Sequence, residues 1–388
     1  MSNPLPRRAF IKSAAAASSL LLVQPRIAFG AQANETLRLG LIGSGGRGPW
    51  IANFFEQHTN SKCVAVHDYF KDQVDAAGNR LNVPEDRRYI GLDGYKELLA
   101  SDIDAVAIMS PAYFHPEQAV AALEAGKHVY LAKPMAVDVP GCQAIVDAAN
   151  AHPELTTLID YQTRKNPQYQ KAVQMVHDGA IGAPVCGQAY YHTRRLNIRT
   201  KPGDPTAPLR NWFFHIPLSG DIIVEQNIHT IDVANWILDA RPLAATGTGG
   251  RRVRTDVGDA WDHFIVTYTY PKNVLIDFSS TQFVTGFDDI CTRIFGADGT
   301  IDAHYFGDVS VTAKSKTMPP ENTGNIYADG AITNVKEFVA SIVDNKPINN
   351  TEASADSTMA CILGRTAAYT GTTVTWEEMT GKGERLDP

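Results

Sequence analysis

The sequence lacks long apolar runs and any excess of positive charge, and each absence excludes a class of protein. No uninterrupted apolar stretch reaches the roughly 18 residues that a membrane-spanning helix needs, so we expect no stable membrane insertion. The 35 Lys and Arg face 42 Asp and Glu, and the resulting formal net charge of −7 argues against nucleic acid as a partner. With 44% apolar residues, the chain can bury a sizeable core, and 388 residues suggest two domains.

Cysteine is also scarce, and nothing in its spacing suggests a metal or redox site. The five cysteines are far apart and form no Cys-x-x-Cys pair, and the 11 histidines show no zinc-ligand spacing. We therefore expect neither a structural disulfide nor a catalytic metal. The chain also has no internal repeat.

The first residues are typical of an export signal. Arg7 and Arg8, with Phe10 two positions on, precede a short apolar run from Ala14 to Val23 and then several small residues. This arrangement resembles a twin-arginine signal peptide, which we expect over residues 1–33. That route exports proteins already folded in the cytoplasm, so we expect a periplasmic or otherwise extracytoplasmic protein.

From Leu37 the chain alternates short β-branched runs with helix-like segments. This alternation predicts an α/β fold with an N-terminal Rossmann domain, a doubly wound parallel sheet, over residues 34–158. The expected strands are 37–42, 63–67, 104–109, 128–131 and 157–160, with helical stretches around 95–99 and 117–125.

A glycine-rich loop follows the first of these strands and opens a helix. Gly43 allows a tight turn, Gly45 lets a pyrophosphate approach the backbone, and the helix amides beyond Gly48 supply partial positive charge. About 20 residues further on, Asp68 ends the second strand, where a ribose-binding carboxylate belongs. The loop therefore predicts a dinucleotide site. Its residues are Gly43, Ser44, Gly45, Gly46, Arg47 and Gly48.

Asp68 also bears on the choice of dinucleotide. A carboxylate there accepts hydrogen bonds from a free ribose 2′-hydroxyl and repels a 2′-phosphate, which predicts NAD rather than NADP. Arg47 keeps NADP open as an alternative, because a nearby guanidinium could offset the repulsion.

Further motifs resemble those of the glucose-fructose oxidoreductase/inositol dehydrogenase/MocA family. The resemblance runs from about Leu37 to Trp376. Ala132 and Glu225 depart from the family's Glu and Asp, and Asn227 stands where Gly is usual, which indicates a reshaped substrate pocket. The motifs that carry it are Ser110-Pro111-Ala112-Tyr113-Phe114-His115, Ala132-Lys133-Pro134, Gly182-x-Pro184-Val185, and Gly220-Asp221 through Glu225-x-Asn227-x-His229-x-x-Asp232.

The resemblance implies hydride transfer between a secondary alcohol carbon and the nicotinamide. It places the Lys133 side chain at the reacting hydroxyl of the substrate and assigns the acid/base role to His229. Glu225 lies four residues before His229 on a helix expected over Asp221–Leu238, so both could point into one cleft, Glu225 orienting His229 or binding a substrate hydroxyl. Asp232 is expected to steady the helix or the imidazole.

The resemblance also implies further residues that contact the cofactor or the substrate. Ser110, His115, Lys133 and Gln162 are expected at the cofactor. The expected substrate contacts are Lys133, Arg164, Trp212, Glu225 and His229, with Asn211 and His215 as further candidates.

The second half, residues 159–388, is expected to be an α+β domain with an open, mainly antiparallel sheet. By resemblance it binds the substrate and makes a homo-oligomer, a dimer or tetramer. The expected strands are 185–192, 263–270, 274–279, 292–295 and 300–305, with hairpins at 271–273 and 297–299 and helices over 332–343 and 354–369.

Three functions are compatible with these patterns. The first is an NAD-dependent oxidoreductase acting on a sugar, polyol or glycoside hydroxyl, whose cofactor is tightly bound because a periplasm offers no free NAD. The second is an NAD-retaining glycoside hydrolase or epimerase that oxidises a carbon transiently with no net redox. The third is a sugar-binding module without catalysis. The retained Lys133 favours net dehydrogenation, and the intact glycine loop argues against the third.

Overall fold

The first sheet is parallel throughout and carries the glycine loop at one edge. The computed structural model describes residues 36–387, and within them this sheet has six strands in the order β3-β2-β1-β4-β5-β6. The expected doubly wound parallel sheet is confirmed. The short β3 was not foreseen. The strands are β1 (Leu37–Ile42), β2 (Ser61–Asp68), β3 (Arg88–Ile90), β4 (Ala105–Ile108), β5 (His128–Ala132) and β6 (Thr157–Asp160).

Helices cover both faces of this sheet, as its buried strands require, because every residue of β4 and β5 is buried. The helices between its strands are α2 (Arg47–His58), α3 (Lys71–Leu81), α4 (Gly94–Ala100), α5 (His115–Glu124) and α6 (Val139–Ala151).

The second sheet is mixed but mainly antiparallel, as expected. Among the described residues it has nine strands in the order β14-β13-β12-β11-β7-β10-β9-β8-β15, with one parallel pair, β7 and β10. The strands are β7 (Pro184–Thr193), β8 (Ala244–Gly250), β9 (His263–Tyr270), β10 (Val274–Gln282), β11 (Asp289–Gly296), β12 (Gly299–His304), β13 (Asp308–Ala313), β14 (Met318–Asn322) and β15 (Val374–Thr375).

Strands β8 and β14 had escaped sequence analysis because their composition is poor for strands. β8 contains three glycines and β14 two prolines, and both residue types are depleted in strand interiors. Their hydrogen-bonded neighbours hold them in the sheet. Tertiary pairing therefore overrides local preference at both positions.

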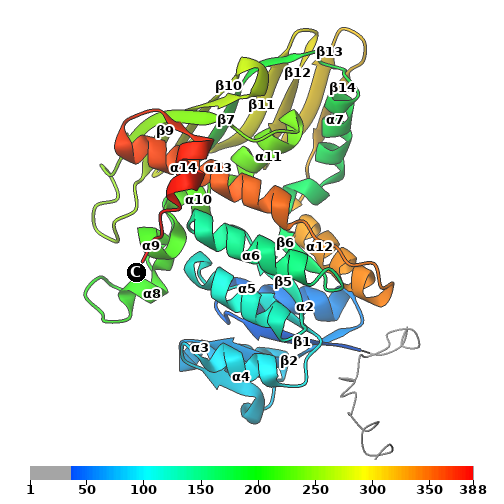
Figure 1. Cartoon of the computed structure of the whole chain (residues 1–388), viewed down its shortest axis with the longest axis vertical. Coiled ribbons are helices and arrows are strands. Elements are labelled where there is room, and N and C mark those ends of the chain that lie inside the picture. Colours follow the sequence, from blue (N-terminus) through cyan, green and yellow to red (C-terminus); the bar gives the residue numbers. More distant parts are fainter. Residues whose placement is uncertain (1–35, 388) are drawn as a thin grey trace, which may run out of the picture. The chain divides into compact units, whose positions relative to one another are not determined.

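Helix α12 (Ile326–Val343) belongs by packing to the first sheet, although it comes late in the chain. It lies beside α2 (Figure 1). The Phe338 ring on α12 meets Phe55 and Tyr130 edge-on, with ring centroids 5.8 and 5.6 Å apart. The core of the first sheet is therefore completed by a helix that begins 166 positions after its last strand.

Helix α13 (Thr351–Thr370) runs between α6 and the second sheet (Figure 1). The remaining helices are α7 (Pro167–His177), α8 (Ala207–Arg210), α9 (Ile216–Ser219), α10 (Ile222–Glu225), α11 (Ile228–Leu238) and α14 (Trp376–Lys382), and the short 3-10 turns are η2 (Glu85–Arg87), η3 (Ala112–Phe114), η4 (Thr163–Lys165), η5 (Trp212–Phe214) and η6 (Pro271–Asn273).

The predicted signal peptide lies outside the described residues. Among those that are described, no helix is both long and apolar enough to cross a bilayer.

Candidate active site

The glycine loop turns tightly and leaves its centre open. Gly43 has a positive φ of 88°, and a Cβ there would lie 2.5 Å from the Met109 carbonyl carbon, so β1 can turn against the end of β4 only with glycine. A Cβ on Gly48 would lie 2.0 Å from the Gly43 oxygen. By contrast, Gly45 and Gly46 face open space and line a cavity. The loop therefore offers accessible backbone where a pyrophosphate would approach.

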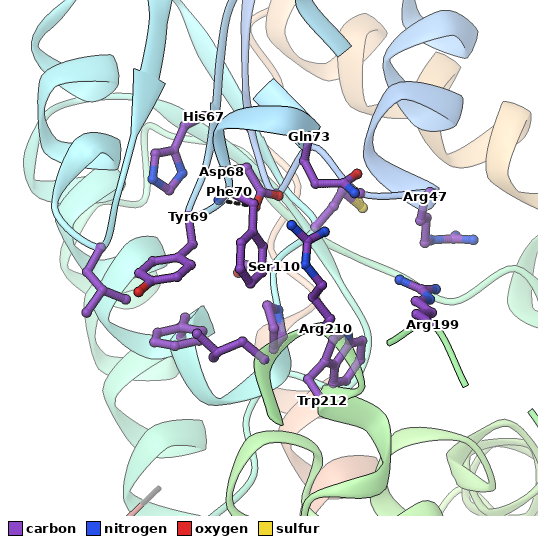
Figure 2. Close-up of a pocket in the computed structure, with 18 of the residues that line it drawn as sticks. Arg47, His67, Asp68, Tyr69, Phe70, Gln73, Ser110, Arg199, Arg210 and Trp212 are labelled. Carbon is purple, nitrogen blue, oxygen red and sulfur yellow. Dashed lines mark hydrogen bonds between the residues drawn. The ribbon is translucent and has the colours of Figure 1, made fainter. Parts of the chain in front are cut away.

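A cavity of about 270 Å³ opens at the carboxyl ends of β1, β2 and β4 (Figure 2). This is the edge at which ligands bind in open parallel sheets. Residues from the second half of the chain close its other side. The cavity is lined by Gly43, Gly45, Gly46, Arg47, His67, Asp68, Tyr69, Phe70, Gln73, Gly91, Leu92, Met109, Ser110, Pro111, Phe114, Gln118, Arg199, Thr200, Leu209, Arg210 and Trp212.

Asp68 lies in this cavity with its carboxylate fixed by the backbone. It accepts hydrogen bonds from the Ser44 amide at 2.8 Å and from the Phe70 amide at 3.0 Å. Burial raises the pKa of Asp68 above its usual value. The residues present fit a dinucleotide with a free ribose 2′-hydroxyl, because a held carboxylate accepts from that hydroxyl.

Arg47 lines the same cavity, but its guanidinium is committed elsewhere. It donates to the Asp160 carboxylate at 2.5 Å and to the Tyr327 hydroxyl at 2.6 Å. Asp160 is fully buried, so its negative charge offsets that of Arg47. The charge of the Arg47 guanidinium, on which the NADP alternative depended, is thus neutralised by Asp160 inside the protein.

Asp68→Asn should reverse part of the preference for NAD. The amide retains one oxygen acceptor for the backbone but loses the second oxygen and the charge that a ribose hydroxyl pairs with, and a hydrogen bond to a charged group is worth about 1.5–3 kcal/mol. We expect the affinity of the cofactor-free protein for NAD to fall by roughly 10- to 100-fold and the ratio of NAD to NADP affinity to fall with it. Binding titrations of the cofactor-free protein with both dinucleotides measure this ratio, and an unchanged ratio would contradict the assignment.

Lys133 and Glu225 meet although they are far apart in sequence. Lys133 follows β5, and its Nζ donates to the Glu225 carbonyl oxygen at 2.5 Å and lies 3.5 Å from Glu225 Oε1. Both side chains are largely buried. The Lys133–Pro134 peptide bond is cis. The end of β5 thus places the Lys133 ammonium group at the C-terminal end of α10.

The prediction of one continuous helix over residues 221–238 is wrong. Helix α10 ends at Glu225 and α11 begins at Ile228. Gln226 and Asn227 both donate their amides to the Ile222 carbonyl, which closes the first helix. The Gln226 side chain accepts from Gln282 on β10 at 2.8 Å. A cross-element contact that sequence periodicity does not show therefore stabilises the break, and the four-residue spacing no longer fixes how Glu225 and His229 relate.

His229 is buried, with 7% of its surface exposed, and its Nδ1 has no hydrogen-bond partner. Burial, and then the positive charges of Lys133 and Arg47, lower its pKa well below the usual value. Its ring packs against Tyr305, with centroids 5.2 Å apart. The imidazole is therefore neutral at pH 7, and a neutral imidazole has one nitrogen that can accept a proton.

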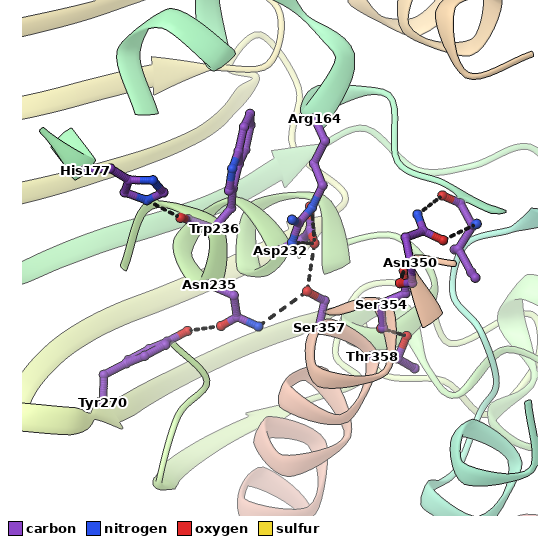
Figure 3. Close-up of polar contacts among 11 residues, drawn as sticks. Arg164, His177, Asp232, Asn235, Trp236, Tyr270, Asn350, Ser354, Ser357 and Thr358 are labelled. Carbon is purple, nitrogen blue, oxygen red and sulfur yellow. Dashed lines mark hydrogen bonds and ion pairs between the residues drawn. The ribbon is translucent and has the colours of Figure 1, made fainter. Parts of the chain in front are cut away.

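Arg164 and Asp232 pair with each other. Arg164, expected at the substrate, donates to both oxygens of Asp232 at 2.8–3.1 Å. Asp232, expected to steady the helix or the imidazole, also accepts from Ser357 at 2.7 Å (Figure 3). Because Asp232 is fully buried, it needs this charge partner, so both side chains serve to join α11 to η4 and α13.

Of the remaining predicted residues, some line the cavity and others lie behind it. Ser110 lines the cavity and donates to Gln118 at 2.6 Å. His115 lies behind it, with Nδ1 2.8 Å from the Pro134 oxygen and Nε2 2.9 Å from the Ser110 oxygen. Gln162 donates to Asp160 at 3.2 Å, and its Oε1 has no partner. Trp212, expected at the substrate, lies in the cofactor cavity.

Sequence analysis missed the residues from Arg199 to Arg210 that close this cavity. A signal was available. The segment 194–210 contains four arginines and a lysine in a chain with net negative charge. Such a cluster indicates an anionic partner, but without tertiary structure nothing placed it opposite the glycine loop.

A separate cluster on β11 and β12 brings together Asp289, Cys291 and His304, with ligand atoms within 4.8 Å of one another. His304 lies 3.4 Å from Asp289 and 3.3 Å from Asp302, and hydrogen bonding to Asp302 raises its pKa. These ion pairs account for the arrangement. The expectation of no catalytic metal stays a prediction.

Asp221, just before α10, gives the protein a pH-dependent stability. Its carboxylate is fully buried, its φ is 76°, and it accepts from Tyr369 at 2.6 Å, from Trp261 at 3.2 Å and from Ile222 at 2.6 Å. Burial raises its pKa to about 6. Because the folded pKa exceeds the unfolded one, stability from this group is full below about pH 4 and is lost as pH rises through 6, by up to about 3 kcal/mol.

Asp221→Asn should therefore be destabilised most at low pH. The amide has lost favourable contacts at every pH, but it escapes the ionisation penalty that the wild type meets between pH 4 and 6. The gap in unfolding free energy between the two proteins should narrow over that range, as urea denaturation at several pH values would measure. A constant gap would mean that Asp221 does not titrate there.

These features define a class of enzyme: a nicotinamide-dependent oxidoreductase with its cofactor at the carboxyl edge of a Rossmann sheet. The chain belongs to the GFO/IDH/MocA oxidoreductase family. The family's N-terminal model, an NAD-binding Rossmann fold, matches residues 37–158, and its C-terminal domain model matches residues 169–302. The predicted family and the predicted cofactor, NAD, are confirmed.

Similar proteins agree with this membership. The inositol 2-dehydrogenase of Rhizobium meliloti (strain 1021) is 25% identical over 318 residues, which are 79% of this chain and 89% of that protein. Scyllo-inositol dehydrogenase from Lactobacillus casei has a TM-score of 0.70 at 22% identity, with 88% of this chain and 98% of that chain covered. Aldose-aldose oxidoreductase from Caulobacter crescentus has a TM-score of 0.72 at 18% identity, with 88% and 100% covered.

Proposed function

We propose that this protein oxidises a secondary hydroxyl of a sugar or polyol, passing the hydride to NAD, with Lys133, Glu225 and His229 as the catalytic residues. The contact between Lys133 and Glu225 carries the proposal. It brings an ammonium group at the end of β5 to a carboxylate residue 92 positions later, which is the arrangement that a catalytic site shared by the two halves of the chain needs.

Each residue has a role that follows from its surroundings. NAD, when bound, takes the hydride from the alcohol carbon. The Lys133 ammonium stabilises negative charge on the alcohol oxygen as its proton leaves. His229, whose imidazole is neutral, accepts that proton. Glu225 holds the Lys133 side chain and offers its carboxylate to a neighbouring hydroxyl.

Named relatives support the substrate class. They include inositol 2-dehydrogenases, a scyllo-inositol dehydrogenase with bound NAD(H) and scyllo-inositol, and a levoglucosan dehydrogenase with NADH and levoglucosan. All of these substrates present several hydroxyls on one ring. The side-chain oxygens of Gln162 and Asn227 are buried without hydrogen-bond partners, and ligand hydroxyls would supply the missing donors.

The proposal extends to location and assembly. The arginine pair at Arg7 and Arg8 supports export by the twin-arginine route after folding. A cofactor loaded before export then has to stay bound. The second sheet supports a homo-oligomer, because alternate residues of β9 are exposed, among them Ile265 at 55%.

The test uses the protein purified with its own cofactor. It is mixed with a panel of inositols, aldoses, anhydrosugars and glycosides, and the near-ultraviolet absorbance of reduced nicotinamide is followed. Reduction by a ring polyol or sugar supports the proposal. Cleavage or epimerisation with no accumulation of reduced nicotinamide would replace it by the redox-neutral alternative, and no response to any member of the panel would oppose both.

A further inference from the structure

Part of the second half of the chain forms the outer wall of the cofactor cavity. Of the residues that line it, Arg199, Thr200, Leu209, Arg210 and Trp212 belong to the segment between β7 and α9. We call residues 199–212 the strap. The strap lies opposite the Asp68–Phe70 segment, so the cavity has a wall from each half of the chain (Figure 2).

Arg210 joins the strap directly to the first half. Its guanidinium donates to both carboxylate oxygens of Asp72, at 2.8 and 3.1 Å, and its central carbon lies 4.0 Å from the centroid of the Phe70 ring. Figure 2 shows the side chain extending across the cavity from the Trp212 side towards Phe70 and Gln73. A bidentate pair combined with a cation–π contact fixes both the distance and the orientation of the two walls.

The strap is held at its base by Asn211, which is fully buried. The Asn211 side chain accepts from the Arg199 amide at 2.8 Å and the Thr200 amide at 3.2 Å, and it donates to the Thr200 oxygen at 2.6 Å. These bonds join the two ends of the strap. The strap therefore moves as a unit, and Arg210 is its connection to the far wall.

We propose that the strap slows dissociation of the dinucleotide and that the Arg210 bridge to Asp72 and Phe70 is the contact responsible. This inference rests on the proposed function, since it takes the cavity to hold NAD. A cofactor enclosed by two walls leaves only when they separate, and separation breaks the bidentate pair and the ring contact together. Loss of the bridge should therefore speed dissociation more than it disturbs the fold.

The experiment measures NADH dissociation from the full protein. NADH is bound to the purified protein, unlabelled NAD is added in excess, and the decay of energy transfer from tryptophan to bound NADH is followed by stopped flow. Arg210→Met and Asp72→Asn should each raise the dissociation rate by about tenfold or more. The double variant should be little faster than Arg210→Met, because that change alone removes both the ion pair with Asp72 and the contact with the Phe70 ring.

Arg241→Met is the matched control. Arg241 pairs with Asp356 at 3.0 Å and lies 4.6 Å from the Trp376 ring, a similar combination of contacts away from the cavity. Its dissociation rate should equal that of the wild type. If Arg210→Met and Asp72→Asn also release NADH at the wild-type rate, the strap proposal is overturned while NAD binding stands. If the purified wild type neither carries NAD nor binds NADH, the proposed function itself fails.

Discussion

Lys133→Ala should lower turnover by about three orders of magnitude while NAD stays bound. General acid–base and charge-stabilising groups typically contribute factors of 10²–10⁴, and the Lys133 ammonium is positioned by the Glu225 carbonyl at 2.5 Å. Lys133 does not line the cofactor cavity, so cofactor binding should be affected far less than kcat. Rapid-reaction kinetics and the nucleotide content of the purified variant measure the two effects separately.

Lys171→Ala provides the control for this change. Lys171 forms an ion pair with Glu321 on the surface, so its loss removes one ammonium group without touching the proposed site. Its kcat should equal that of the wild type. Turnover in Lys133→Ala within a few-fold of wild type would remove Lys133 from the mechanism and leave the Lys133–Glu225 contact as a purely structural link.

Asp232→Ala should cost about 3 kcal/mol of unfolding free energy. Asp232 is fully buried and holds Arg164, so its removal leaves a largely buried guanidinium without its charge partner. Losses of 3–5 kcal/mol are typical of such changes, and the lower end applies because a quarter of the Arg164 side chain reaches solvent. Urea unfolding followed by circular dichroism measures the loss.

Two further variants separate charge from packing in this network (Figure 3). Ser357→Ala removes only the hydroxyl that donates to Asp232 at 2.7 Å and should cost about 1–2 kcal/mol. The double change of Arg164→Met with Asp232→Leu should recover much of the stability, because no charge is then left unpaired. If the double variant is less stable than Asp232→Ala, the unpaired charge is not the source of the loss.

The motifs that carry chemistry could be predicted from the sequence because each depends on residues close together in the chain. The turn at Gly43 is set by backbone sterics within a few residues, and Asp68 follows a buried strand at a spacing fixed by the βαβ unit. Lys133 could be placed at a strand end for the same reason. Parallel sheets bring strand ends to one edge, so these positions predicted a common site before any coordinates were available.

Pairing between side chains that are far apart in the sequence could not be predicted in the same way. Arg164 was assigned to the substrate because its position matches a family segment, but a guanidinium goes to whichever buried carboxylate the fold brings near, and here that is Asp232. Arg47 is likewise taken by Asp160. A continuous helix was expected over residues 221–238, and the contact between Gln226 and Gln282, which are far apart in the chain, helps to explain why it breaks.

The resemblance to the family singled out Lys133 and Glu225, and the sequence by itself determined the parallel sheet, the dinucleotide loop and the choice of NAD. Periodicity, glycine sterics and strand-end position express these within short stretches of chain. Only the tertiary structure decided which charges are free to act, which helix completes the first core and which segment closes the cofactor cavity. Those outcomes depend on the burial of groups far apart in the chain. Burial sets the free-energy cost of an unpaired charge, and it also determines which partner is near enough to remove that cost.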